Sequence, residues 1–220
     1  MRLSSMQAPT HSLEILVTGA SGGIGSAIVE ELQKRDCHVI GTDRNDADMS
    51  SYEDIKHLAL SALQEKLDWV VYAHGFIDAE TDLAKQLREN ITATFDINTL
   101  SNIYLTQMLL SRIGTGIIFI SSTAALSPNG RFAAYSASKA AVNAFAQALA
   151  KHRPALTCIT VCPGPTMTAM RKKIASDAAL SQSPEAVART VADIISGRSK
   201  YKSGDIVIVK DGNDSLYREL

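Results

Sequence analysis

Short apolar runs alternate with longer amphipathic stretches along almost the whole chain. Runs such as "ILV", "WVV" and "IIFI" are apolar without a break, which is typical of strands covered on both faces. The predicted strands are Leu13–Thr18, His38–Thr42, Trp69–Ala73, Gly116–Ser121, Leu156–Val161 and Asp205–Val209. Helical periodicity and start signals predict helices over Ile24–Arg35, Ser51–Lys66, Glu80–Phe95, Asn98–Arg112, Tyr135–Lys151 and Ser183–Ser196. This alternation predicts a parallel sheet with helices on both faces.

Composition and charge narrow the class of protein. The 220 residues include 22 Lys and Arg against 23 Asp and Glu, so the net charge is −1, which gives no electrostatic footprint for nucleic acid or an anionic membrane. No apolar run approaches the roughly 20 residues of a membrane span. Cys37, Cys158 and Cys162 lack a metal-like spacing and predict free thiols in a reducing compartment. We therefore expect a cytoplasmic protein without a metal site. Residues 1–12 predict a flexible arm without the apolar core of a signal peptide, and residues 13–220 a single domain.

A glycine-rich turn, "TGASGGIGSA" (Thr18–Ala27), leads from the first strand into the first helix. Glycine permits positive φ and lets the backbone approach a ligand, and the following helix N-terminus suits a pyrophosphate group. A tight turn without a ligand is the alternative. The cofactor contacts expected from this turn are Gly19, Ser21, Gly23, Ile24 and Gly25.

The second strand ends at Asp43, about 20 residues beyond the glycine turn. A carboxylate there is placed to bind the ribose hydroxyls of NAD and to repel the extra phosphate of NADP. Arg44 follows directly and either holds that phosphate or is a solvated loop charge. NAD is therefore the favoured cofactor, with NADP left open.

In "YSASK", Tyr135 and Lys139 lie four residues apart and share one face of a helix. A nearby ammonium lowers the pKa of a phenol, which then exchanges a proton with an alcohol or a ketone more readily. An unrelated surface pair is the alternative. Ser122 follows the "GIIFIS" strand, where its hydroxyl is expected on the ligand side of the sheet and in reach of a carbonyl oxygen.

The "TGASGGIG" and "YSASK" segments resemble the cofactor motif and the Tyr-x-x-x-Lys signature of the short-chain dehydrogenase/reductase family. The resemblance implies reversible, nicotinamide-dependent oxidation of a secondary alcohol to a ketone. It also implies that Tyr135 transfers the proton, Ser122 holds the substrate oxygen, and Lys139 tunes Tyr135 and binds the nicotinamide ribose. Asn98 would support a water relay, although a simple helix cap is its alternative role.

The same resemblance assigns further cofactor contacts and shows one departure. The additional contacts that it implies are Asp48, Met49, Ala73, Gly75, Pro163, Gly164, Thr166 and Thr168. Where the family usually reads Asn-Asn-Ala-Gly, this chain reads Tyr72-Ala73-His74-Gly75. The loss of the second asparagine, at Ala73, raises a structural question. His74 is either an acid or base, or a loop histidine near the cofactor, and the second interpretation is favoured because Tyr135 and Lys139 fill the catalytic role.

These observations predict a single doubly wound α/β domain with a seven-stranded parallel sheet. The alternatives are a double-bond reductase on the same scaffold and a cofactor-sensing protein without turnover. The predicted helices Asn98–Arg112 and Tyr135–Lys151 carry apolar residues on more than one side, which predicts a homodimer or homotetramer. The substrate is left open, because the variable substrate loop at Ala169–Gln182 shows no readable pocket.

Overall fold

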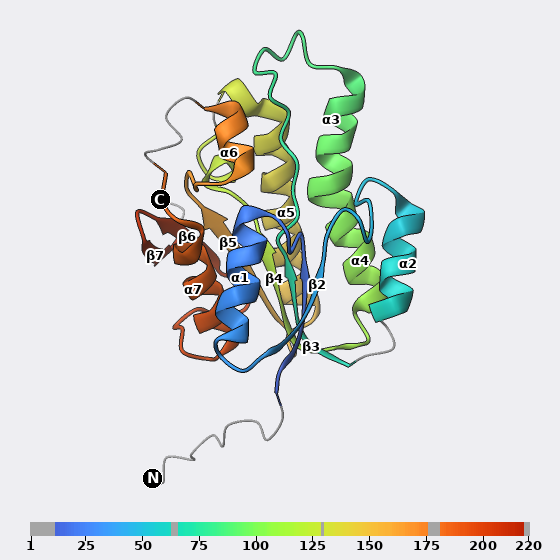
Figure 1. Cartoon of the computed structure of the whole chain (residues 1–220), viewed down its shortest axis with the longest axis vertical. Coiled ribbons are helices and arrows are strands. Elements are labelled where there is room, and N and C mark those ends of the chain that lie inside the picture. Colours follow the sequence, from blue (N-terminus) through green and yellow to red (C-terminus); the bar gives the residue numbers. More distant parts are fainter. Residues whose placement is uncertain (1–11, 63–65, 129, 176–180, 218–220) are drawn as a thin grey trace.

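One seven-stranded sheet in the order β2-β1-β3-β4-β5-β6-β7 forms the centre of the protein (Figure 1). The computed structural model describes residues 12–62, 66–128, 130–175 and 181–217, so the predicted arm lies outside the described residues except for Ser12. The strands are β1 (Glu14–Thr18), β2 (His38–Thr42), β3 (Leu67–Tyr72), β4 (Ile113–Ile120), β5 (Thr157–Pro163), β6 (Ile206–Lys210) and β7 (Asn213–Leu216).

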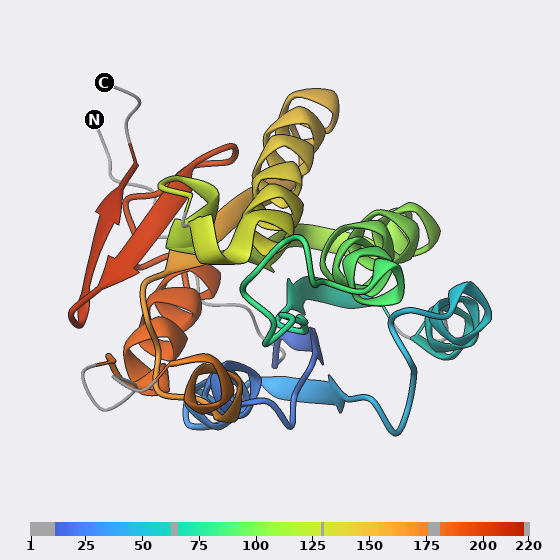
Figure 2. The same cartoon turned by 90° about the horizontal axis from the view of Figure 1, so that it is seen from above.

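Helices cover both faces of this sheet, as the view from above shows (Figure 2). They are α1 (Gly23–Gln33), α2 (Tyr52–Ala62), α3 (Arg88–Phe95), α4 (Ser101–Leu109), α5 (Ala133–His152), α6 (Ala169–Ile174) and α7 (Pro184–Ile195), with a π turn at Asp96–Leu100 and short 3₁₀ turns at Thr123–Ala125 and Gly130–Phe132. Helices α1 and α7 pack on one face, and α2, α4 and α5 on the other. Within the described residues, none of these helices combines the length and the apolarity that crossing a bilayer requires.

The unbroken apolar runs arise because the central strands β1, β3, β4 and β5 each serve two cores. In β1, Leu16 packs into the cluster under α4 and α5, whereas Ile15 and Val17 pack into the cluster under α1 and α7. Successive side chains of a strand point to opposite faces, so a strand with both faces covered has no polar positions. The doubly wound fold with seven strands is confirmed.

The prediction of an entirely parallel sheet is wrong for one strand. Strand β7 runs antiparallel to β6, with Lys210 opposite Asn213. The two residues between them, Asp211 and Gly212, both have positive φ, at 52° and 79°. Such a two-residue turn matches the twist of a hairpin and favours Asp-Gly, which explains why the chain turns straight back here.

The predicted helices are present with three differences. The helix expected from Glu80 begins only at Arg88, and the helix expected from Asn98 contains the π turn before α4. Helix α6 was not predicted. Ser51 caps the start of α2, since Asp54 N donates to Ser51 Oγ at 3.3 Å and Ser51 Oγ donates to Asp54 Oδ1 at 3.0 Å.

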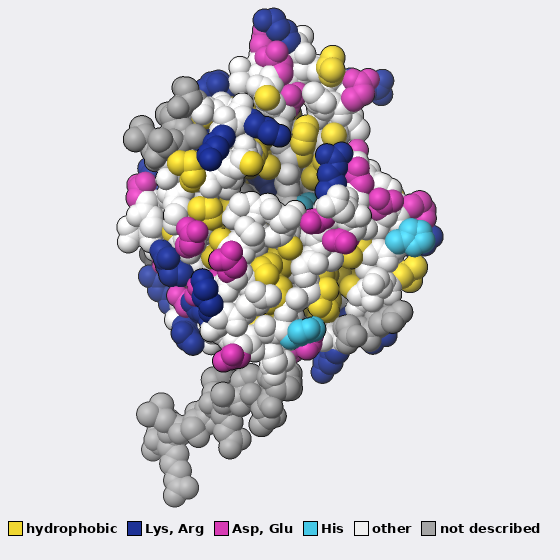
Figure 3. Space-filling model, viewed as in Figure 1, with side chains coloured by type: hydrophobic (Ala, Val, Ile, Leu, Met, Phe, Trp, Pro, Cys, Tyr) yellow, Lys and Arg dark blue, Asp and Glu magenta, His cyan; other side chains and the backbone are white. Residues whose placement is uncertain are grey.

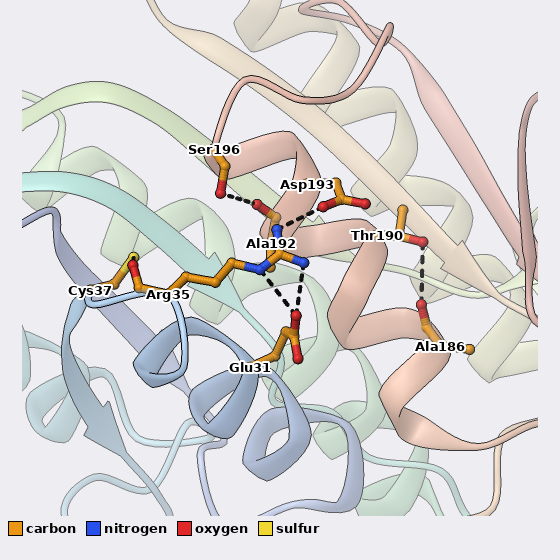
Figure 4. A network of polar contacts seen from close by, with 8 residues as sticks. All are labelled: Glu31, Arg35, Cys37, Ala186, Thr190, Ala192, Asp193 and Ser196. Carbon is orange, nitrogen blue, oxygen red and sulfur yellow. Dashed lines mark hydrogen bonds and ion pairs between the residues drawn. The ribbon is translucent and has the colours of Figure 1, made fainter. Parts of the chain in front are cut away.

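An arginine joins the two helices on the α1 side of the sheet (Figure 4). Arg35 Nε and Nη2 donate to Glu31 Oε1 at 3.0 and 2.7 Å, and Nη1 donates to Asp193 Oδ1 at 2.7 Å. Asp193 lies on α7, so the guanidinium bridges the end of α1 and that helix. The side chain of Asp193 is 46% exposed, and such a pair contributes only modestly to stability.

Two glycines of β4 give a sharp packing test. A Cβ at Gly116 would collide with the ring of Trp69 and lie 2.5 Å from Thr157 O, whereas a Cβ at Gly114 would lie 3.6 Å from its nearest neighbour. Gly116→Ala should therefore lower the free energy of unfolding by about 1–3 kcal/mol. Gly114→Ala should change it by no more than about 0.5 kcal/mol. Urea unfolding of both variants checks this, and equal effects would contradict the packing described.

Candidate active site

A cavity of about 330 Å³ opens at the carboxyl ends of β1, β2 and β3. Figure 3 shows hydrophobic and basic side chains mixed around the hollow on this face, over α6 and beside the segment that leads to α3. Most of the predicted cofactor contacts line this cavity: Gly19, Ser21, Gly23, Ile24, Asp43, Arg44, Asp48, Met49, Ala73, Gly75 and Thr168. It therefore brings together residues from the first half of the chain and from the segment 168–170.

The glycine turn lines this cavity with residues that have no side chain, and two of them pack too closely against their neighbours to allow one. Gly19 has φ +70°, and a Cβ there would lie 2.6 Å from His74 N. A Cβ at Gly23 would lie 2.8 Å from Thr168 Cγ2. Gly25 does not line the cavity, since its place is inside the turn, where a Cβ would collide with Gly19 O. Helix α1 begins after Gly22 without a side-chain cap, and Gly22, Gly23 and Ile24 line the cavity. The uncapped N–H groups at this helix start suit an anionic group such as a pyrophosphate.

Acidic residues and one arginine mark the far end of the cavity. Asp43 Oδ1 accepts a hydrogen bond from Asn45 N at 2.8 Å, which fixes the direction of this carboxylate. Arg44 Nη2 lies 3.8 Å from Asp48 Oδ2, in a largely exposed ion pair. Hydrogen bonds from the backbone and hydroxyl of Ser50 lower the pKa of Asp48, and Arg44 adds to this effect. Arg44 therefore has a carboxylate partner of its own.

A second cavity, of about 250 Å³, lies beside the first. The predicted residues on its wall are Ser122, Tyr135, Pro163, Gly164, Thr166 and Thr168. Three residues, Ile24, Thr168 and Met170, line both cavities, so the two spaces adjoin there. A group bound in the first cavity can thus reach a group bound in the second at this border.

The Tyr135 side chain is half-buried and hydrogen-bonds Ser122. Burial raises the pKa of the Tyr135 phenol, and the Ser122 hydrogen bond opposes this only in part. The expected lowering by Lys139 is not found in the protein alone, because Lys139 Nζ lies 6.0 Å from the centre of the Tyr135 ring. In this state the phenol is protonated and is placed as a proton donor toward the second cavity.

Lys139 is buried and fastens α5 to the end of β4. Its Nζ donates to Ile120 O at 2.9 Å, and Ser121 Oγ donates in the opposite direction to Lys139 O at 3.1 Å. Burial lowers the pKa of Lys139 to about 8. The side chain lines neither cavity, although a Cβ at Gly75 on the wall of the first would lie only 3.4 Å from Nζ.

Asn98 lies in the π turn before α4 and is fully buried. Its Nδ2 donates to Phe76 O at 2.8 Å and to Ser138 Oγ at 2.9 Å, and its Oδ1 accepts from Phe76 N at 2.7 Å. These bonds join the segment after β3 to α5, so the side chain is not a helix cap. A π turn inside an α-helix often occurs at a functional site.

Comparison with known proteins assigns the family. Residues 14–62 and 46–179 match the model of the short chain dehydrogenase family. The chain belongs to this family, whose members are oxidoreductases. The 3-oxoacyl-(acyl-carrier-protein) reductase of Rickettsia bellii is 30% identical over 231 residues, covering 90% of this chain and 95% of the relative.

Solved structures share the fold of this short-chain dehydrogenase. The 3-ketoacyl-(acyl-carrier-protein) reductase of Brucella melitensis complexed with NADH has 20% identity and a TM-score of 0.82, covering 90% of this chain and 96% of the other. A short chain dehydrogenase of Shigella flexneri complexed with NADP has 24% identity and a TM-score of 0.82, covering 89% and 95%. At these identities the similarity shows the fold alone.

The departure from the usual asparagines has a physical explanation in this short-chain dehydrogenase. The hydroxyl of Tyr72 accepts a hydrogen bond from Thr106 Oγ1 at 3.1 Å. His74 Nδ1 lies 2.6 Å from Thr18 Oγ1, and Nε2 lies 2.7 Å from Ser101 Oγ. The two side chains therefore tie the end of β3 to α4, where asparagines are absent. Burial lowers the pKa of His74 to about 3, with Lys139 contributing, so the ring is neutral at physiological pH and is not a general acid.

Several lining residues were not predicted from the sequence. They are Gly22, Ala47, Phe76, Ile97, Ala169 and Met170 around the first cavity and Ile77, Thr123, Ala124, Ser127, Phe132, Pro165, Arg171 and Ile174 around the second. His74, which was expected as a loop histidine near the cofactor, also lines the first cavity. Phe76 and Ile77 follow directly after β3 and could have been found from that position. The lining residues on α6 could not be found in this way, because a helix of this length shows no clear periodicity in the sequence. No cluster of three or more His, Cys, Asp or Glu in the described part of the chain is arranged to hold a metal ion.

The low pKa of His74 predicts acid sensitivity. The unfolded chain takes up this proton as the pH falls below about 6.5, whereas the folded protein resists it down to about 3, so the stability is present above 6.5 and is lost below it. Between pH 7 and 4.5, wild type should lose about 2–3 kcal/mol more than His74→Gln, at about 1.4 kcal/mol per pKa unit. Urea unfolding at a series of pH values measures this. A difference that does not change with pH would show that His74 does not resist protonation.

Proposed function

We propose that this protein transfers a hydride between a nicotinamide cofactor and a secondary alcohol or ketone. The observation that carries the proposal is the border between the two cavities at Ile24, Thr168 and Met170. The first cavity is lined by the glycine turn and the start of α1, which suit a dinucleotide, and the second has Tyr135 and Ser122 on its wall. A carbonyl carbon at this border would lie between a hydride source and a proton source.

The chain's own residues would hold the cofactor along the first cavity. The N–H groups at the start of α1 would bind the pyrophosphate, Asp43 the adenosine ribose, and Thr168 with Thr166 the nicotinamide carboxamide. The bound cofactor would supply or accept the hydride. Thr168 Oγ1 already accepts a hydrogen bond from Arg171 N at 3.1 Å, which leaves its hydroxyl proton available for such a contact.

The second cavity would hold the reacting oxygen. Ser122 would donate to the carbonyl oxygen, and Tyr135 would give it a proton in reduction or take one in oxidation. The raised pKa of Tyr135 keeps the phenol protonated in the protein alone, which is the form that reduction requires. Lys139 would bind the nicotinamide ribose and tune Tyr135, with Asn98 beside it supporting a water relay. A ketone with an apolar part suits the wall formed by Ile77, Phe132 and Ile174, and the name of the Rickettsia relative also indicates a keto group.

Replacing Tyr135 by phenylalanine removes the proton-transferring oxygen and little else. Tyr135→Phe should lower kcat at least about 100-fold, while the Kd for NADH changes by less than about threefold. The measurement is turnover on a panel of ketones and alcohols together with NADH fluorescence titration. Tyr201→Phe, which alters a phenol bonded to Asp214 in the β6–β7 region, is the matched control and should keep wild-type rates. Wild-type turnover by Tyr135→Phe would refute the mechanism, and cofactor binding without any turnover by wild type would favour a cofactor-sensing protein.

We propose NAD as the preferred cofactor. Asp43 presents a carboxylate where the ribose should lie, and like charge against the NADP phosphate costs on the order of several kcal/mol. Arg44 could pair with that phosphate, but it already has Asp48 as a partner.

Asp43→Ser should therefore shift the ratio of kcat/KM for NAD to that for NADP by at least about tenfold toward NADP. Asp46→Asn is the control, since it removes a neighbouring charge but keeps an oxygen that can accept from Asp43 N. A wild-type ratio favouring NADP tenfold would show that Arg44 decides the choice.

We further propose a homodimer or homotetramer. Helix α5 exposes Ala137, Ala140 and Ala144, and Ile103 and Met108 of α4 are only half-buried. Met108 also packs against the core cluster under α4 and α5, whereas the other four positions lie outside that cluster and favour a partner copy. Light scattering at micromolar concentration should give at least twice the mass of one chain, and a monomer would contradict this.

A further inference from the structure

We propose that His74 is a positioning residue for the reaction, which fixes the π turn carrying Asn98 to the ends of β1 and β3. This inference rests on the proposed function, because it concerns the same site. His74 lines the first cavity and replaces a small residue of the usual family pattern. The structure supports this role through three successive sets of contacts.

The first set gives the imidazole one defined direction. Ser101 Oγ donates to Ile97 O at 2.7 Å, and a hydroxyl has only one proton. Ser101 Oγ must therefore accept from His74 Nε2–H, which lies 2.7 Å away. In the neutral ring, Nδ1 is then an acceptor, and Thr18 Oγ1 donates to it at 2.6 Å rather than to Val71 O, which is 3.5 Å away. Hydrogen bonds thus run in one direction from the end of β1, through His74, to a carbonyl of the π turn.

The second set shows that side chains hold the π turn together. Ser101 Oγ donates a hydrogen bond to Ile97 O at 2.7 Å, and Asn102 Nδ2 donates one to Asn98 O at 2.8 Å. A wide turn of this kind changes the usual helical pairing of backbone groups, so its shape depends on such side-chain donors. His74 connects this set of bonds to the sheet.

The third set carries the position of the turn to the reacting groups. Asn98 binds both the N–H and the C=O of Phe76 and also reaches Ser138, the neighbour of Lys139 in α5. The segment from His74 to Phe76 is therefore held at one end through Ser101, which bonds Ile97 O of the π turn, and at the other end by Asn98. Between these ends, a Cβ at Gly75 would lie 3.3 Å from Asn98 Oδ1 and 3.4 Å from Lys139 Nζ. A shift of the turn would thus displace the cavity wall beside Lys139.

Tyr72 offers a matched control on the same strand. Its side chain is also buried and also ties β3 to α4, through Thr106. Thr106 lies five residues beyond Ser101 along α4, farther from Asn98. A loss of the Tyr72 tie should weaken the packing of α4 without moving the π turn.

The experiment compares His74→Leu, His74→Gln, Ser101→Ala and Tyr72→Phe with wild type. In His74→Leu and Ser101→Ala, kcat should fall about 10- to 100-fold while KM for the ketone changes less than about threefold, because misplaced groups slow the chemical step. His74→Gln keeps one donor and one acceptor and should recover at least about a third of the wild-type kcat. Tyr72→Phe should keep kcat within about twofold at a lowered Tm. If His74→Leu does not fold, Ser101→Ala and His74→Gln decide the matter.

A second measurement does not depend on turnover. Hydrogen exchange at the Phe76 amide, which Asn98 Oδ1 accepts, should be at least about tenfold faster in His74→Leu and Ser101→Ala than in Tyr72→Phe at equal global stability. If wild type has no turnover, the proposed function fails and this exchange measurement alone tests His74. Unchanged exchange, or a kcat loss in Tyr72→Phe equal to that in His74→Leu, would reduce His74 to a general packing role and overturn the proposal.

Discussion

The buried ammonium of Lys139 on the carbonyl of Ile120 fixes the candidate active site. A charge without water must find hydrogen-bond partners, so this contact determines how α5 lies against the end of β4. Ser121 Oγ donates a second hydrogen bond, to Lys139 O, which further restricts how α5 can lie on β4. One helical turn earlier, Tyr135 then lies over Ser122, the residue that follows Ser121. The position of the phenol follows from this attachment of the lysine.

The burial of Lys139 also explains why many hydrogen bonds between buried side chains surround it. Burial already lowers the pKa of Lys139 to about 8, so the charge depends on the hydrogen bond to Ile120 O, and Gly75 forms the cavity wall beside it. Asn98, Ser138 and His74 hold that wall by hydrogen bonds among buried groups, which are costly to leave unpaired. Hydrogen-bonded polar side chains therefore lie behind the cavities, while the hydroxyl groups of Ser122 and Tyr135 lie on the wall of the second cavity.

Much of this arrangement could be predicted from the sequence. Unbroken apolar runs indicate buried parallel strands, and the glycine turn and the Tyr135–Lys139 spacing locate the two cavities. The antiparallel β7 was missed although Asp211-Gly212 is a hairpin signal, and α6 is too short for periodicity to reveal. The roles of Tyr72 and His74 could not be predicted, because each depends on partners about 27 to 56 residues away in the chain. The raised pKa of Tyr135 could not be predicted either, because it depends on burial and not on the spacing to Lys139.

The pH dependence of kcat/KM for ketone reduction in wild type and Lys139→Arg is the most direct measurement. With a pKa of about 8, Lys139 is charged below that pH and loses its charge above it. Wild-type kcat/KM should therefore be level below about pH 7 and fall above about pH 8. Arginine remains charged, so in Lys139→Arg, normalised to its own maximum, the fall should move to higher pH. The same profile in both proteins would contradict a site that depends on the Lys139 ammonium.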